Sequence, residues 1–232
     1  MLQAIDLTKK YGNQVALNSL NLTVKPGEVF CLLGQNGAGK TTTINLFLGF
    51  LQATSGEARV NGIPVVPGQP ETVKHLAYIP EVVMLYPNLT SLENLDFFSR
   101  IAGFDYDREA LEAYLLRAGL REDAFDKRVG NHSKGMRQKV GIAIAIAKNA
   151  SAVLMDEPTS GLDPGATHDF TETVKTLAGN NTSVFMATHD IFNAVNMASH
   201  IGIMRKGNLV HVLRADDISS DDVRQLYLET IR

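Results

Sequence analysis

Short apolar segments alternate with polar turns along the chain, and this pattern predicts buried strands. Residues 29–33 and 152–155 are apolar throughout, which is typical of strands whose two faces are both covered in a parallel sheet. A Pro-Gly turn signal at 26–27 precedes the first of them. Further strands are predicted at 2–7, 20–24, 77–79, 183–188 and 201–204, with a hairpin through 206–208 and short strands and turns between 55 and 70.

Amphipathic stretches between these strands predict helices at 41–51, 107–118 and 166–178, and from Asp221 onward. A capping-box pattern at residues 90–93 opens another helix. The apolar side chains of that helix are expected to face inward, and they are Leu92, Leu95, Phe98 and Ile101. Residues 141–147 alternate in a way that also suits a strand. Because alanine favours helices and no turn separates this segment from the polar run before it, we predict a buried helix.

Composition limits the kinds of protein that this chain represents. Its 232 residues, 44% of them hydrophobic, suit one large domain. A net charge of −3 and a pI near 6.1 argue against broad nucleic-acid binding. One cysteine, Cys31, gives no disulfide framework and fits a reducing compartment. The sequence has no secretory signal pattern and no apolar run that approaches a membrane span, so we expect any membrane role to depend on a partner.

A glycine-rich segment after the first apolar strand carries the strongest chemical signal. It reads Gly34-Gln35-Asn36-Gly37-Ala38-Gly39-Lys40-Thr41-Thr42, and it fits the G-x-x-x-x-G-K-[ST] pattern. Glycines let the backbone wrap around an anion, so that N–H groups and the start of the next helix face the phosphates of a nucleotide. Lys40 adds a positive charge, and Thr41 offers a hydroxyl to Mg²⁺. The alternative is a glycine-rich turn with a surface lysine, which the strand and helix on either side disfavour.

A second signal lies at the end of the apolar strand 152–155. Asp156 follows that strand, where ligands bind in open α/β sheets, and its carboxylate suits Mg²⁺ held through water. Glu157, the next residue, is placed to activate an attacking water as a general base. Two adjacent acids alone would indicate a solvated loop; their presence beside a phosphate-binding loop favours the catalytic interpretation.

The order of the motifs resembles the ATP-binding-cassette (ABC) ATPases over essentially the whole chain. The phosphate loop is followed by Ser133-Lys134-Gly135-Met136-Arg137-Gln138, by Met155-Asp156-Glu157-Pro158, by Ser160-Gly161-Leu162-Asp163 and by Ala187-Thr188-His189-Asp190. The resemblance implies a P-loop NTPase (RecA-like) α/β core with a mainly parallel sheet, an N-terminal antiparallel β subdomain and an inserted helical subdomain. We therefore expect one domain over 1–232, with the core at about 1–80 and 150–232 and the helical subdomain at 82–148.

The resemblance also implies roles for single residues. The signature segment of one molecule, with Ser133, Lys134, Gly135 and Gln138, is expected to contact ATP held by the phosphate loop of another. Tyr11 resembles the aromatic residue that stacks on adenine; the alternative is an exposed turn tyrosine. His189 resembles the histidine that contacts the γ-phosphate, where with Lys40 it would stabilise the developing charge. Asp163 resembles the acid of the loop that passes between the two molecules.

The sequence departs from the resembled pattern at a few positions. Glu81, after Ile79-Pro80, stands where most members have a glutamine that offers a neutral amide to Mg²⁺; as a candidate metal contact it brings a negative charge instead. His132 and Lys134 replace the leucine and the first glycine of the signature, and Ile144 stands where arginine is frequent. Together with residues 85–95, the Pro-Glu and Ser-Lys-Gly variants resemble the ABC-2-type export subgroup.

These features predict the ATP-hydrolysing subunit of an ABC transporter that uses ATP and Mg²⁺. The expected partners are a separate membrane permease, reached in part through residues 81–86, and a second ABC subunit, identical or not, in the ATP-bound state. We expect no nucleic-acid partner and a place on the cytoplasmic face of the membrane. The alternatives are a regulatory or mechanical ABC subunit, or an ABC ATPase of nucleic-acid maintenance. A P-loop kinase or GTPase would have no use for the signature segment.

Overall fold

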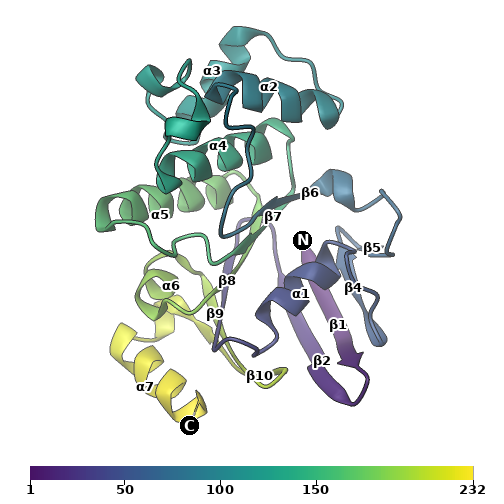
Figure 1. Ribbon diagram of the computed structural model, residues 1–232. Coiled ribbons are helices and arrows are strands. Elements are labelled where there is room, and N and C mark those ends of the chain that lie inside the picture. Colours follow the sequence, from purple (N-terminus) through teal and green to yellow (C-terminus); the bar gives the residue numbers. More distant parts are fainter. Residues whose placement is uncertain (232) are drawn as a thin grey trace.

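The computed structural model describes residues 1–231 and contains two β-sheets with helices on their faces (Figure 1). The N-terminal sheet is antiparallel and has four strands in the order β2-β1-β4-β5. Its first hairpin turns at Gly12 and Asn13, so both strands are longer than the alternation alone predicts. The strands are β1 Leu2–Tyr11, β2 Gln14–Val24, β4 Ser55–Val60 and β5 Ile63–Pro64.

The central sheet has six strands in the order β10-β9-β3-β8-β7-β6. All neighbours are parallel except the edge pair β9 and β10, which form an antiparallel hairpin. The strands are β3 Val29–Gly34, β6 Leu76–Ile79, β7 Ala152–Asp156, β8 Ser183–Thr188, β9 His200–Arg205 and β10 Asn208–Arg214.

The central strands are buried on both faces, as their unbroken apolar sequences predict. Side chains alternate between the faces of a strand, so Cys31 and Leu33 enter one hydrophobic core while Phe30 and Leu32 enter another. Phe185 on β8 stacks on Phe30, with ring centroids 5.9 Å apart. Two cores therefore sandwich the sheet, and the carboxyl ends of its inner strands are held at one edge.

Helix α1 lies between the central sheet and the antiparallel sheet, whereas α4, α5, α6 and α7 follow the other side of the molecule (Figure 1). Helices α2 and α3 contact each other and α4 at one end. Single-turn helices occur at 73–75, 122–124, 129–131 and 215–217. No helix within residues 1–231 is long and apolar enough to cross a membrane. The longer helices are α1 Lys40–Phe47, α2 Ser91–Ile101, α3 Arg108–Arg117, α4 Lys134–Ala147, α5 Pro164–Gly179, α6 Ile191–Met197 and α7 Ser220–Ile231.

The predicted α/β class is confirmed, as are two local predictions. The capping box at the start of α2 forms in full: Thr90 Oγ1 accepts from the Glu93 amide at 3.1 Å, and Glu93 accepts from the Thr90 amide at 2.8 Å. The ambiguous segment 141–147 is helical, as the second half of α4.

Two local predictions need correction, and one helix was missed. Helix α1 ends at Phe47 rather than at residue 51, because Gly49 takes a positive φ of 70° and stops it. Ile101 is 68% exposed rather than inward. It lies six residues after Leu95, about one and two-thirds turns on, and therefore on another side of the helix. The short helix α6 was not predicted, although Asp190 caps it.

Candidate functional site

A cavity of about 650 Å³ opens at the carboxyl ends of the central strands. It lies where the loop between β3 and α1, the ends of β6 and β7, and the first hairpin meet. This is the edge at which parallel α/β sheets hold ligands. Its lining residues are Tyr11, Gln14, Ala16, Gln35, Asn36, Gly37, Gly39, Lys40, Thr41, Thr42, Tyr78, Pro80, Glu81, Val82, Asp156 and Glu157.

The glycines of the phosphate loop are required by its geometry. Gly37 and Gly39 have φ of 79° and 115°, values that residues with a side chain rarely adopt. A Cβ atom on Gly39 would lie 2.7 Å from the carbonyl oxygen of Ala16, and one on Gly34 would lie 2.8 Å from that of Met204. The loop thus packs too closely on β2 and β9 for larger residues. Since α1 begins at Lys40, the unpaired N–H groups of its first turn lie at the loop.

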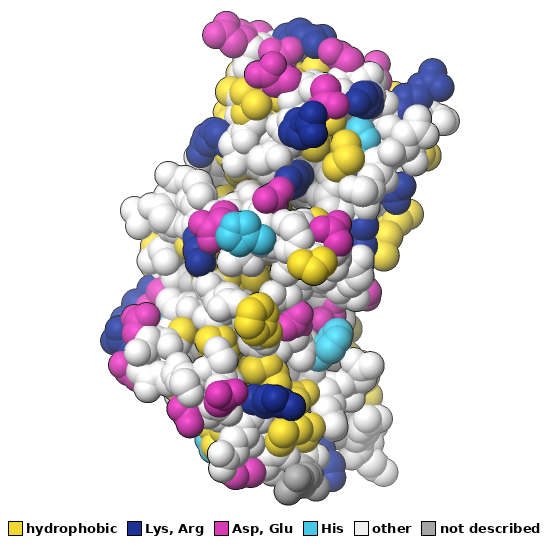
Figure 2. All heavy atoms as spheres, turned by 90° about the vertical axis from the view of Figure 1, so that its left-hand side faces the viewer, with side chains coloured by type: hydrophobic (Ala, Val, Ile, Leu, Met, Phe, Trp, Pro, Cys, Tyr) yellow, Lys and Arg dark blue, Asp and Glu magenta, His cyan; other side chains and the backbone are white. Residues whose placement is uncertain are grey.

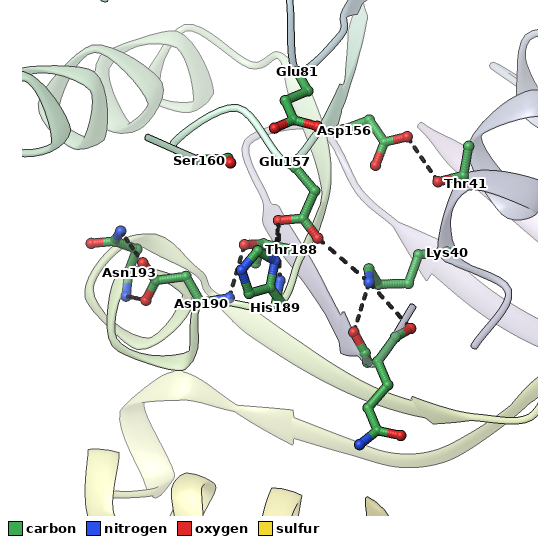
Figure 3. A network of polar contacts seen from close by, with 12 residues as sticks. Lys40, Thr41, Glu81, Asp156, Glu157, Ser160, Thr188, His189, Asp190 and Asn193 are labelled. Atoms are coloured by element: carbon green, nitrogen blue, oxygen red, sulfur yellow. Dashed lines mark hydrogen bonds and ion pairs between the residues drawn. The ribbon is translucent and has the colours of Figure 1, made fainter. Parts of the chain in front are cut away.

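Lys40 is buried, with 6% of its side chain exposed. Its ammonium donates to the carbonyl oxygen of Gly34 at 2.6 Å and to that of Gln35 at 3.5 Å. It also lies 3.5 Å from Glu157 Oε1. The lysine therefore holds the loop curled and places a positive charge against the carboxylate (Figure 3).

Glu157 is held from two sides. Its Oε2 atom lies 2.9 Å from Nδ1 of His189, and the amide of His189 donates to the same oxygen at 3.2 Å (Figure 3). Because a carboxylate only accepts, the short contact assigns the imidazole proton to Nδ1. The backbone of Glu157 has φ of 47°, while its amide donates to Ala187 on β8 at 2.8 Å. Such strain is common at functional sites, and here it turns the side chain toward the cavity.

Asp156 ends β7 and accepts a hydrogen bond from Thr41 Oγ1 at 2.9 Å (Figure 3). Burial raises the pKa of the Asp156 carboxyl above its ordinary value; the bond from Thr41 opposes this, and the charge of Glu157 adds to it. A hydroxyl and a carboxylate at the mouth of a phosphate loop are hard oxygen ligands, and they fit Mg²⁺. Within residues 1–231, no group of at least three His, Cys, Asp or Glu side chains could hold a metal. A magnesium ion here would therefore need oxygens from the substrate and water as well.

Two aromatic residues flank the ends of the cavity. Tyr11, at the end of β1, is 47% exposed, and the ammonium of Lys9 lies 5.0 Å from its ring centroid. A flat, accessible ring at this place suits stacking on a base. Tyr78 on β6 lines the cavity near Asp156; burial, and then the charge of Asp156, raise its pKa.

The signature segment does not line this cavity. Ser133 caps the N-terminus of α4 and accepts from the Met136 amide at 3.3 Å. A Cβ atom on Gly135 would come within 3.3 Å of the Ala166 Cβ, so α4 and α5 approach closely here. The buried amide of Gln138 donates to the carbonyl of Pro158, just after Asp156 and Glu157. The start of α4 is thus fixed to the segment after β7, and it does not line the cavity of its own phosphate loop.

Other predicted residues have local partners. Lys134 donates to the carbonyl oxygen of Ser160 at 2.5 Å and lies 3.8 Å from Glu81 Oε1. Asp163 caps α5 by accepting from the Ala166 amide at 2.9 Å. Glu81 lines the cavity with a side chain that is 53% exposed.

Some lining residues were not singled out from the sequence. Five belong to this set: Gln14, Ala16, Tyr78, Pro80 and Val82. The position of Tyr78 and Pro80 at the end of a predicted strand could have indicated the last three, but nothing local indicated Gln14 or Ala16. His132 also has a role that the pattern did not reveal. Its Nε2 lies 2.7 Å from Ser91 Oγ, which in turn donates to the carbonyl of Ala124 at 2.9 Å, so this buried histidine ties the segment before α4 to the start of α2.

Comparisons with known proteins agree on one family. A sequence profile described as ABC transporter matches residues 17–160. A bacitracin transport ATP-binding protein of Bacillus licheniformis, BcrA, is 34% identical over 227 residues, which are 97% of this chain and 74% of that protein. A linearmycin resistance ATP-binding protein of Bacillus subtilis, LnrL, is 32% identical and covers 95% of this chain and 71% of its own length.

Solved structures agree with the sequence relatives. A dimer of the ATP-binding cassette MJ0796, in a post-hydrolysis state bound to ADP and Pi, matches with a TM-score of 0.81 and 26% identity, over 93% of this chain and 99% of that one. An ATP-binding subunit of an ABC transporter matches with a TM-score of 0.84 and 28% identity, over 98% and 99% of the two chains.

Proposed function

The chain belongs to the ABC transporter family as an ATP-binding, ATP-hydrolysing subunit, and we propose that it drives export by closing on ATP with a second cassette beneath a membrane permease. The observation that carries this proposal is the placement of Glu157 between Lys40 and His189, beside the phosphate loop. An ammonium and an imidazole thus meet at one carboxylate, that of Glu157, which lines the cavity, whereas His189 itself is not among the lining residues (Figure 3).

The proposed chemistry is attack of water on the γ-phosphate. Glu157 takes the proton of the water as a general base, while Lys40 and His189 stabilise the charge that develops on the phosphate oxygens. Glu157 Oε2 already accepts both contacts from His189, whereas Oε1 lies 3.5 Å from the Lys40 ammonium and keeps a lone pair with which to take the proton. Turning the Lys40 ammonium toward a phosphate would free that oxygen further.

Thr41 and Asp156 are the proposed holders of Mg²⁺, with Glu81 as a more distant candidate. Bound there with ATP, the ion would neutralise phosphate charge and orient the γ-phosphate. The backbone of residues 34–42 would bind the phosphates, and the ring of Tyr11 would carry the adenine.

We propose that the complete site needs two molecules. Ser133 and Gly135, at the start of α4, do not line the cavity of their own phosphate loop, yet a helix N-terminus with a serine cap is suited to bind an anion. A second cassette facing this end of α4 would supply the γ-phosphate that joins the two chains, and hydrolysis would release them. The dimer reported for MJ0796 supports this arrangement. Asp163, at the start of α5, would lie at the same contact.

The permease is proposed to dock beside residues 81–86. Val82 and Met84 are 57% and 79% exposed, and a hollow of about 240 Å³ lies close by between the end of α1 and α4. Phe50, with 70% of its surface exposed, lines that hollow together with Ile144 and Lys148. An apolar surface over two subdomains fits a short cytoplasmic helix of a membrane protein, which would then respond to closure around ATP.

The same proposal includes the direction of transport and the division of the chain into a nucleotide-binding core and a helical subdomain. Relatives are named for bacitracin transport, linearmycin resistance and Nod factor export, which favours an exporter. A core at 1–80 and 150–232 and a helical subdomain at 82–148 would allow α4 to move relative to the phosphate loop.

A role in nucleic-acid maintenance has less support, because acidic and basic side chains intermingle on the face shown in Figure 2 and no continuous basic surface is seen there.

Phosphate release by the purified chain, with ATP and Mg²⁺, tests the catalytic assignment. Glu157→Gln is expected to lower kcat by about a hundredfold or more, as for loss of a general base. Glu172→Gln is the matched control, since this exposed acid on α5 contacts only Lys175 and should leave the rate unchanged. Activity of Glu157→Gln near that of the control would contradict the assignment.

The docking surface has its own test. The proposal expects a protein of about six membrane spans encoded beside this chain, and the two proteins should co-purify in detergent. Met84→Asp should abolish co-purification without lowering basal ATP hydrolysis. Val210→Asp, at an exposed position on the edge strand β10, should leave co-purification intact. Equal retention of the membrane protein by both variants would contradict the proposed surface.

A further inference from the structure

Lys134 and Glu81 join two parts of the site that the sequence keeps far apart. Lys134 is the first residue of α4, and Glu81 follows β6. The Lys134 ammonium lies 3.8 Å from Glu81 Oε1 and donates to the carbonyl oxygen of Ser160 at 2.5 Å. Their side chains are 31% and 53% exposed, so the pair is only partly screened by water. One ammonium thus bridges the end of β6, the start of α4 and the segment after Glu157.

The charges that line the cavity are unbalanced without Lys134. Three carboxylates line it, those of Glu81, Asp156 and Glu157, against the single ammonium of Lys40. Lys40 is already paired with Glu157. Burial is the largest cause of the raised pKa of Asp156, and the charge of Glu81 adds a smaller contribution to it. A cavity that must admit a triphosphate therefore has an acidic side chain at Glu81 whose charge needs a counter-charge.

We propose that Lys134 and Glu81 act as one unit, in which Lys134 offsets the charge of Glu81 beside the bound nucleotide and fixes the start of α4 to the catalytic segment. This rests on the proposed function, because it requires ATP in the cavity. Lys134 is a positioning residue: it acts through Glu81 and through the carbonyl of Ser160. The same contact links the nucleotide site of this chain to the helix end proposed to face a second molecule.

The proposal accounts for the contact between a glutamate after β6 and a lysine at the start of α4. A neutral amide at position 81 would need no counter-charge, and a glycine at position 134 would provide none. A glutamate at 81 and a lysine at 134 restore the balance only as a pair. The effect of replacing one residue should therefore depend on the identity of the other, which a double-mutant cycle measures.

The test is such a cycle on the purified chain, with KM for ATP, kcat and Tm measured for wild type, Lys134→Met, Glu81→Gln and the double variant. Lys134→Met should raise KM about fivefold, which corresponds to about 1 kcal/mol for a partly exposed charge. The same replacement in the Glu81→Gln background should change KM by less than about 1.5-fold. Lys134→Arg, which keeps the charge, should retain the wild-type KM.

A neighbouring ion pair on the same helix supplies the control. Lys139 of α4 lies 2.8 Å from Asp169 of α5, and neither residue lines the cavity. Lys139→Met, Asp169→Asn and their double variant should change Tm only, with KM unaltered. Comparison of the two cycles separates an effect on the KM for ATP from an effect on how firmly α4 is held against its neighbours, which Tm reports.

Three results would overturn the inference. Lys134→Met could raise KM equally in both backgrounds, which would mean that Lys134 acts independently of Glu81. Lys134→Met could lower Tm without changing KM, which would leave only a role in folding. Lys134→Arg could fail as badly as Lys134→Met, which would exclude charge as the cause. A wild-type chain that does not hydrolyse ATP would instead refute the proposed function, and this inference with it.

Discussion

Replacement of Gly39 by alanine tests the geometry of the phosphate loop without any nucleotide. Gly39 has φ of 115°, and a Cβ atom there would lie 2.7 Å from the Ala16 carbonyl oxygen and 3.1 Å from Met204 Sδ. The backbone strain costs about 1–2 kcal/mol for an L-residue. The contact with a backbone oxygen adds about 1–3 kcal/mol, since β2 or the loop must shift. We expect Gly39→Ala to lower the free energy of unfolding by about 3 kcal/mol.

Gly37→Ala is the matched comparison, because it separates strain from crowding. Gly37 also has a positive φ, 79°, but a Cβ atom there would meet nothing within 4 Å. Only the strain of about 1–2 kcal/mol should remain. In urea unfolding the two variants should differ by the crowding cost of about 1–3 kcal/mol, or roughly 0.5–1.5 M in midpoint for a slope near 2 kcal/mol/M. Equal midpoints would refute the conclusion that the Gly39 loop is packed against β2.

Three further predictions concern single side chains. Burial raises the pKa of Asp156, so between the ordinary value of 3.8 and the raised value the folded state binds more protons than the unfolded state, and the free energy of unfolding falls as pH rises. Urea unfolding should therefore show Asp156→Asn to be more stable than wild type at neutral pH. Equal stability of the two proteins would contradict this. Burial raises the pKa of Cys31 to about 12, so a thiol reagent at mildly alkaline pH should label it only after unfolding, and rapid labelling of the folded chain would contradict its burial. Lys40→Met should weaken ATP binding by about a hundredfold, or about 3 kcal/mol, in calorimetry, whereas Lys175→Met on α5 should not; equal affinities would contradict the role of Lys40.

The sequence predicted those parts of the fold that depend on local pattern. The strand at 29–33 is apolar because both of its faces are covered, and this two-sided burial is visible residue by residue. The capping box of α2 depends on residues three positions apart and formed as expected. The prediction that Ile101 faces inward was wrong, because the rotation of a helix against its neighbours decides which of its apolar residues are buried. Ser99, a polar residue, is 2% exposed, whereas Ile101 is on the surface.

The site was predictable in its motifs but not in its pairings. Spacing and residue type identified Lys40, Asp156 and Glu157 separately, while their mutual distances depend on the order of strands in the sheet. The pairing of Glu81 with Lys134, 3.8 Å apart, has no local signal, since the two residues are far apart in sequence and lie on different elements. The same holds for His132, whose bond to Ser91 explains a histidine that the pattern presented only as a departure.

The central claim is that two molecules bind ATP between them and separate when Glu157 enables its hydrolysis to ADP and phosphate. Glu157→Gln keeps the shape of the side chain and removes the general base. Light scattering coupled to size-exclusion chromatography, with millimolar ATP and Mg²⁺, should show this variant as a stable dimer. The double variant that also carries Lys40→Met should be a monomer under the same conditions. A Glu157→Gln chain that binds ATP and remains a monomer under these conditions would contradict the account.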